Sequence, residues 1–215
     1  IAVVIIPIVC LYLLQCLLVP KYASDIKEGA MIKEYYNSEK NHDVLILGDC
    51  EVYENISTVT MWENYGIPSY IRGSAEQLIW QSYYLLEDTL KYEKPQVVIV
   101  NVLAMTESDA KSEAYNRMTL DGMKLSKYKI ASIRESMTEE ENMASYIFPL
   151  LRYHSRWSEL SSEDFRYMWK TPSVTTNGYL MQKGVRPVKT IPKAAPLANY
   201  TFSDRNMEYQ IGRAS

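Results

Sequence analysis

The stretch DVLILGDCE, residues 43–51, decides the expected fold. Its apolar run at 44–47 has the length and composition of a buried strand. Gly48 allows the tight turn that ends such a strand. In an open α/β sheet, the loop after the first strand is a favoured place for chemistry. Cys50 is therefore the first candidate nucleophile, and the alternative interpretation is a small, buried hydrophobic residue.

Two further strands are expected, at 68–72 and 96–102, and each follows a helical segment. The first helix is predicted to begin at Ser57 or Thr58, either of which can cap it, and to end at Gly66, which suits a left-handed end. The unbroken β-branched run within 96–102 is typical of a strand that is covered on both faces. The alternation of strands and helices predicts parallel strands with right-handed crossovers.

The helix before the third strand has its own start signal. Ser74 and Gln77 have the spacing of a capping box, so we expect this helix to begin directly after Ser74. Lys94 and Pro95 are expected to end it before the third strand.

The three predicted strands end at residues that share one edge of the sheet. Cys50 follows the first strand, Gly73 the second and Asn101 the third. A backbone N–H at Gly73 and the amide of Asn101 are donors of the kind that an oxyanion hole needs. The sequence therefore predicts a nucleophile with two oxyanion donors, although Asn101 could equally be a polar strand end.

The N-terminal segment 1–20 has no charged residue and is rich in Ile, Val and Leu. As a helix it would span about 30 Å, so it is expected to be a transmembrane anchor. A signal-peptide core or a buried helix are the alternatives. The polar segment 21–41 is expected to form a juxtamembrane stalk, and 42–215 an α/β domain.

The composition limits the classes of function. A net charge of −3 gives no electrostatic reason to expect a nucleic-acid partner. Two histidines and three cysteines, two of them in the apolar N-terminus, predict neither a metal site nor a disulfide framework. The glycine-rich phosphate signatures are absent, which ranks a nucleotide-binding domain last. We expect no cofactor.

The motifs together resemble a known family. GDC at 48–50 is similar to the Gly-Asp-Ser block of SGNH (GDSL-type) hydrolases, with Cys50 at the position of the nucleophilic serine. GSAEQ at 73–77, KP at 94–95, FPL at 148–150 and YHSRW at 153–157 extend the likeness. This series is similar to membrane-anchored bacterial SGNH-type proteins related to the accessory proteins of D-alanyl transfer and alginate acetylation.

The resemblance implies a three-layer, flavodoxin-like parallel sheet for 42–215. It also implies an acyl-ester hydrolase or O-acyltransferase that acts on a cell-surface polysaccharide. Such a protein would be anchored in the cell membrane by a single helix, with its domain outside the cytoplasm. A membrane-bound acyltransferase is a possible partner by the same likeness.

The sequence departs from the family at the catalytic base. These enzymes take their base from an Asp-x-x-His element near the C-terminus, and none occurs in the 215 residues. We therefore expect the chain to be a C-terminally truncated fragment. Cys50 could ionise in part through a helix N-terminus, against the repulsion of Asp49 and Glu51. His154 is the other candidate base, but a structural or sugar-contacting role is favoured for it. The alternative function is a non-catalytic carbohydrate-binding or assembly partner of a membrane acyltransferase.

Overall fold

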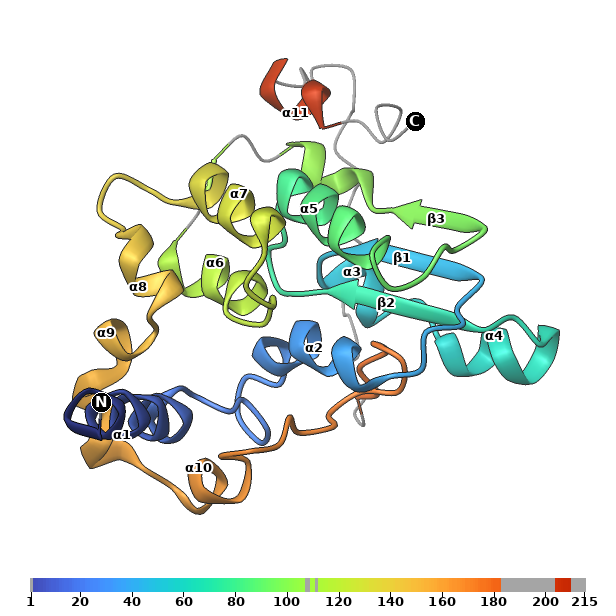
Figure 1. Ribbon diagram of the computed structural model, residues 1–215. Coiled ribbons are helices and arrows are strands. Elements are labelled where there is room, and N and C mark those ends of the chain that lie inside the picture. Colours follow the sequence, from blue (N-terminus) through green and yellow to red (C-terminus); the bar gives the residue numbers. More distant parts are fainter. Residues whose placement is uncertain (1, 107–108, 111, 183–203, 210–215) are drawn as a thin grey trace, which may run out of the picture.

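A small parallel sheet lies at the centre of the protein, with helices around it (Figure 1). The computed structural model describes residues 2–106, 109–110, 112–182 and 204–209. The strand order is β2-β1-β3, and both pairings are parallel. The predicted α/β class with parallel strands is thus confirmed. The strands are β1 (Val44–Gly48), β2 (Ser69–Gly73) and β3 (Val97–Val100).

The helices connect the strands and continue beyond them. The expected domain at 42–215 includes 183–203 and 210–215, which lie outside the described residues. The α-helices are α1 (Ala2–Leu18), α2 (Glu28–Glu34), α3 (Cys50–Tyr53), α4 (Thr58–Tyr65), α5 (Ile79–Thr89), α6 (Glu113–Leu120), α7 (Lys127–Ser136), α8 (Met143–Ile147), α9 (Leu150–Tyr153), α10 (Ser162–Arg166) and α11 (Asp204–Glu208). The 3-10 helices are η1 (Tyr35–Asn37), η2 (Val102–Thr106) and η3 (His154–Glu159).

The central strand β1 is buried along its whole length. Its side chains alternate between two clusters, as the pleat of a strand requires. Leu45 and Leu47 pack in a cluster with residues of α5, α6 and α7. Val44 and Ile46 pack in a second cluster with α3 and the segment around Leu180. Helices therefore cover one face of β1, and α3 with a later segment covers the other.

Strand β3 differs from the prediction. Val97 and Ile99 are 50% and 41% exposed, whereas Val98 and Val100 pack against the core. The reason is position, because β3 is at the edge of the sheet and α3 and α4 cover β1 and β2 instead. The expectation that both faces of this strand are covered is wrong for the described residues.

The first helical crossover follows the sequence signals closely. The Ser57 hydroxyl accepts a hydrogen bond from the Thr60 N–H at 3.1 Å, so Ser57 caps α4. Gly66 ends the helix with φ +65°, a conformation that favours glycine. The predicted start and end of this helix are confirmed.

The second crossover begins later than predicted. Helix α5 starts at Ile79, and Ser74 does not cap it. The Ser74 hydroxyl instead donates to the Gln77 side chain at 3.2 Å, inside a buried polar cluster. The N–H of Leu78 is satisfied by the Gln81 side chain at 3.2 Å. The capping-box prediction was wrong because buried tertiary partners outweigh a local cap.

The segment 21–41, expected to be a stalk, contributes to the core. Met31 and Ile32 of α2 are 1% and 0% exposed and belong to the two clusters that flank β1. Helix α2 contacts β2 and α6. The segment thus packs against the β2 side of the sheet instead of forming a separate stalk.

Helix α1 lies at one side of the molecule, beside α9, η3 and α10 (Figure 1). It has 17 residues, which corresponds to a length of about 26 Å. A transmembrane helix was expected here, but within the described ranges we find no helix that combines the length and the hydropathy needed to cross a membrane. Its apolar side chains are nevertheless exposed, including Val4, Ile5, Ile6, Ile8, Val9, Leu11 and Leu14.

Candidate active site

The three residues proposed for catalysis follow the three strand ends at one edge of the sheet. Gly48 is opposite Gly73 in the β1–β2 register. The N–H of Asn101 donates to the carbonyl of Leu47 at 2.9 Å, which fixes Asn101 beside the end of β1. Cys50 follows two residues after Gly48, as the first residue of α3. Parallel pairing thus brings the strand ends that carry these residues together, as the sequence predicted.

Asp49 connects the first and third strand ends. Its Oδ1 accepts a hydrogen bond from the Asn101 side-chain amide at 2.8 Å and another from the Glu51 N–H at 3.1 Å. The side-chain oxygen Oδ1 of Asn101 accepts from the Leu103 N–H at 2.9 Å. One predicted oxyanion donor is therefore held by Asp49. This capping role of Asp49 was not predicted, although an aspartate directly before a short helix is a typical N-cap.

Two glycines allow the strand ends to approach closely. A Cβ atom on Gly48 would lie 2.4 Å from Val52 Cγ2 and 2.6 Å from Asn101 Cβ. A Cβ atom on Gly73 would lie 2.7 Å from the carbonyl oxygen of Gly48. Any other residue at either position would push the edge apart, so packing alone gives a reason for both glycines.

The surroundings of Cys50 favour the neutral form of its thiol. It is half-buried and packs against the cluster on the α3 face of β1. Burial raises the pKa of Cys50, and the carboxylates of Asp49, Glu51 and Glu54 raise it further. The expected repulsion by Asp49 and Glu51 is confirmed, and together with burial it outweighs the lowering of the pKa that the backbone N–H at the start of α3 provides.

Neither histidine is placed to act as a base for Cys50. His42 is buried, and its Nδ1 lies 2.9 Å from the Glu93 carboxylate. His154 is exposed in η3, a helix that contacts α1 and α9, and its Nδ1 lies 2.9 Å from the Leu151 carbonyl. The described part of the chain therefore supplies no imidazole at this edge.

The strand order gives this edge its significance. The chain leaves β1 towards β2 on one side, and β3 then returns to the other side of β1. The order reverses between β1 and β3, and ligands of open α/β sheets bind in the crevice at such a switch point. The hydrogen bond between Asp49 and Asn101 spans this point.

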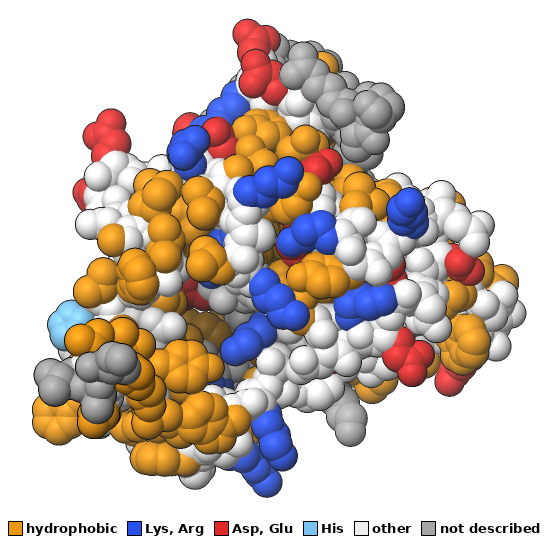
Figure 2. Space-filling model, in the orientation of Figure 1, with side chains coloured by type: hydrophobic (Ala, Val, Ile, Leu, Met, Phe, Trp, Pro, Cys, Tyr) orange, Lys and Arg blue, Asp and Glu red, His pale blue; other side chains and the backbone are white. Residues whose placement is uncertain are grey.

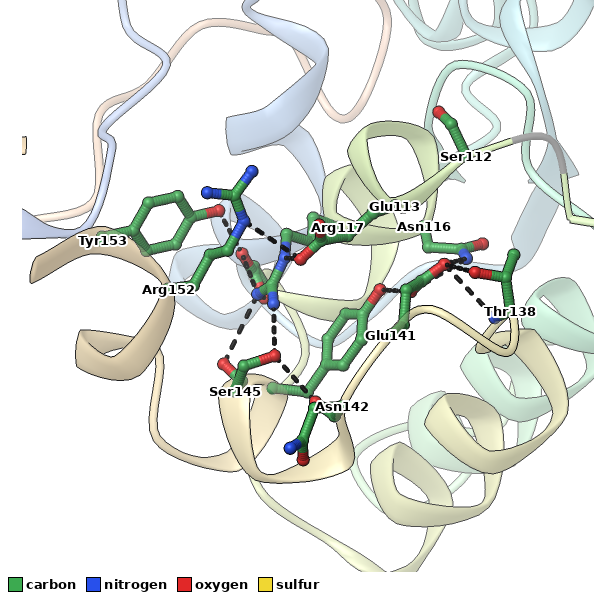
Figure 3. Close-up of polar contacts among 12 residues, drawn as sticks. Ser112, Glu113, Asn116, Arg117, Thr138, Glu141, Asn142, Ser145, Arg152 and Tyr153 are labelled. Carbon is green, nitrogen blue, oxygen red and sulfur yellow. Dashed lines mark hydrogen bonds and ion pairs between the residues drawn. The ribbon is translucent and has the colours of Figure 1, made fainter. Parts of the chain in front are cut away.

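A second polar centre joins α6 to the segment of α8 and α9 (Figure 3). Arg117 is its hub, donating to Glu113 at 2.7 Å, to Asp121 at 3.1 Å and to the Ser145 hydroxyl at 2.8 Å. Its guanidinium also lies 4.1 Å from the centre of the Tyr146 ring. No sequence signal singled out this centre, because its members come from separate helices. Its satisfied contacts fit a structural role.

Comparisons with known proteins leave the fold and this edge as the basis for any assignment. No family model, no curated protein and no solved structure matches the chain. Across the residues that the structure describes, no group of three or more His, Cys, Asp or Glu side chains could hold a metal ion.

Proposed function

We propose that the protein is an SGNH-like acyl-ester hydrolase or O-acyltransferase with Cys50 as its nucleophile. One observation carries the proposal: Cys50 follows β1 at the sheet's switch point, with Asn101 fixed beside the same strand end. The strand order β2-β1-β3 agrees with the first three strands of a flavodoxin-like sheet. The resemblance of the GDC motif to the SGNH block adds the chemistry.

The proposed reaction proceeds by covalent catalysis. The Cys50 sulfur attacks the ester carbonyl while a base takes the thiol proton. The N–H of Gly73 and the amide of Asn101 donate to the developing oxyanion. The carbon–oxygen bond then breaks, the alcohol leaves with a proton, and a thioester remains. Water or a sugar hydroxyl releases the acyl group, with the base supplied from outside the described residues.

The substrate and the location follow from the resemblance and from α1. We propose an acyl ester on a cell-surface polysaccharide, a domain outside the cytoplasmic membrane, and a membrane-bound acyltransferase as a partner. The exposed apolar side chains of α1 would hold the protein at the membrane.

Hydrolysis of 4-nitrophenyl acetate by the full chain tests the proposal. We expect Cys50→Ala to remove turnover, Cys50→Ser to retain a reduced rate, and Cys10→Ala in α1 to leave the rate unchanged. Equal rates for the wild type, Cys50→Ser and Cys50→Ala would reject Cys50 as the nucleophile.

A non-catalytic role is the second candidate, and the electrostatics of the edge favour it. The raised pKa of Cys50 and the hydrogen bond that occupies Asn101 suit a structural edge as well as a reactive one. The domain would then bind carbohydrate or assist a membrane acyltransferase. Binding of an acetylated polysaccharide that survives Cys50→Ala, without any ester turnover, is the result expected for this role.

A further inference from the structure

A cavity of about 410 Å³ lies between the C-terminal part of α1 and the body of the protein. Its walls come from segments that are distant in the sequence, including α1, α2, the residues after α6 and the chain after α10. This volume is within the range of pockets that hold small molecules. The cavity is separate from the Cys50 edge, because none of Cys50, Gly73 and Asn101 lines it.

Part of the cavity wall is apolar. Tyr12, Val19 and Pro20 contribute from α1 and its end, and Ile147, Pro149 and Met168 contribute from the opposite side. This wall continues into the exposed apolar surface of α1, which Figure 2 shows as a hydrophobic area at the lower left. An apolar chain could therefore extend from the cavity along the apolar side chains of α1.

Four lysines also contribute to the wall, Lys21, Lys33, Lys129 and Lys170, and the Nζ of Lys21 donates to carbonyls at the end of α1. Lys129 is only 6% exposed, and its Nζ donates to the Met123 carbonyl at 3.1 Å. Burial lowers the pKa of both Lys129 and Lys21, and the charge of Lys33 lowers both further. These lysines are thus close enough to repel one another, and an anion among them would relieve that repulsion.

The two nearest carboxylates each pair with an arginine, although Asp121 also raises the pKa of Lys129 and Asp164 that of Lys21. Asp121 lines the cavity but accepts from Arg117 at 3.1 Å and from the Tyr153 hydroxyl at 2.8 Å. Asp164 lies nearby and accepts from Arg156 at 2.9 Å. Within the described ranges, no ion pair joins Lys33 or Lys170 to a carboxylate. The wall of the cavity therefore combines positively charged and apolar side chains.

From this arrangement we infer that the cavity binds an anionic amphiphile, such as a lipid with a phosphate headgroup. The phosphate lies among Lys21, Lys33 and Lys129, and the apolar chain follows the α1 wall. Lysine is a common phosphate ligand and acts as a point charge, so it requires no particular headgroup geometry. The inference concerns a site that the proposed ester chemistry does not use.

Binding of short-chain lipids to the full chain in a non-ionic detergent tests the inference. Dihexanoylphosphatidic acid carries the phosphate and the tails, dihexanoylphosphatidylcholine carries the tails without net charge, and glycerol 3-phosphate carries the phosphate alone. We expect the phosphatidic acid to bind about tenfold more tightly than either of the other two, a difference that corresponds to about 1.4 kcal/mol. Equal affinity for the two lipids, or for glycerol 3-phosphate and the phosphatidic acid, would overturn the inference.

Three variants show whether the lysines of the cavity are responsible. Lys33→Gln is at an exposed position and should fold, so we expect it to weaken binding of the phosphatidic acid about threefold to fivefold. Lys129→Gln should weaken it more, provided that circular dichroism shows a folded protein. Lys127→Gln makes the same charge change on the exposed side of α7 and should bind as the wild type does. An equal loss in Lys127→Gln and Lys33→Gln would contradict the inference, and Cys50→Ala should have no effect.

Discussion

The edge beside Cys50 and the cavity beside α1 have opposite charge. Three carboxylates, those of Asp49, Glu51 and Glu54, raise the pKa of the Cys50 thiol. Four lysines line the cavity, and its aspartate is paired with Arg117. This difference in charge means that the two proposed sites favour different kinds of ligand. A neutral acyl ester suits the edge, whereas an anionic group would be repelled from it and attracted to the cavity.

The two regions also differ in how they are built. The edge depends on neighbours in the sequence, from Gly48 to Glu54, with Asn101 added from β3. The cavity depends on side chains that are more than 100 residues apart, such as Lys21 and Met168. The contacts of Arg117 hold one part of the cavity wall together (Figure 3). Replacing Arg117 should therefore disturb the cavity much more than the Cys50 edge.

Arg117→Met is expected to have the largest effect. The side chain of Arg117 is 4% exposed and pairs with Glu113 and Asp121, so its loss leaves buried carboxylate charge uncompensated. We expect a loss of about 3–5 kcal/mol in the free energy of unfolding, measured by urea denaturation. Arg134→Met, at an exposed position of α7, should cost little. Similar losses in the two variants would show that the Arg117 centre does not support the cavity.

Gly48→Ala should disturb the edge and leave the cavity intact. The new methyl group would lie 2.4 Å from Val52 Cγ2 and 2.6 Å from Asn101 Cβ, so we expect a loss of about 1–3 kcal/mol. Gly66→Ala is the matched comparison, because nothing lies within 4 Å there and only the φ of +65° is unfavourable. It should cost about 1 kcal/mol. Unfolding by urea measures both, and an undisturbed Gly48→Ala variant would contradict the close approach of the two strand ends.

Asp49→Asn should change the reactivity of the edge more than its stability. Removing this carboxylate lowers the pKa of Cys50, so the thiolate fraction at neutral pH rises. We expect Cys50 to react a few-fold faster with iodoacetamide at pH 7, measured by peptide mapping. Glu63→Gln on the exposed side of α4 is the control and should leave the rate unchanged. An unchanged rate in Asp49→Asn would mean that the Asp49 carboxylate does not contribute to the raised pKa of Cys50.

The pH dependence of the cavity gives the smallest expected effect. Burial, helped by the charges of Lys33 and Arg156 and opposed by Asp164 and Cys16, lowers the pKa of Lys21 to about 8. As the pH rises through about 8, the cavity loses one of its four charges, so binding of the phosphatidic acid should weaken. The unfolded chain keeps this proton to higher pH, so the same group makes folding more favourable as pH rises above 8. Lys21→Arg should remove the decline in binding, and its persistence in that variant would exclude Lys21 as the cause.

Local signals in the sequence predicted the parts of the structure that depend on local interactions. The strand at 44–47, the cap at Ser57 and the left-handed Gly66 were predicted correctly, because each needs only its neighbours in the chain. Ser74 failed as a cap because its hydroxyl has buried partners that are set by tertiary packing. The exposure of Val97 and Ile99 depends on the position of β3 in the sheet, which composition does not reveal.

The candidate site could be predicted in position but not in its electrostatics. Parallel strands bring their carboxyl ends to one edge, so the grouping of Cys50, Gly73 and Asn101 follows from the order of strands and helices. The hydrogen bond from Asn101 to Asp49 depends on side-chain geometry, which spacing alone does not give. The lysine cavity was missed altogether because its members share no motif.

Acylation of Cys50 is the most direct test of the proposed chemistry. The full chain would be incubated briefly with 4-nitrophenyl acetate, denatured in acid and mapped by mass spectrometry. Cys10 and Cys16 provide internal controls, since both are free cysteines and Cys10 is more exposed than Cys50. A nucleophile assisted by Gly73 and Asn101 predicts an acetyl group on Cys50 in excess of both controls. Acetylation of Cys10 and Cys16 with none on Cys50 would contradict the account.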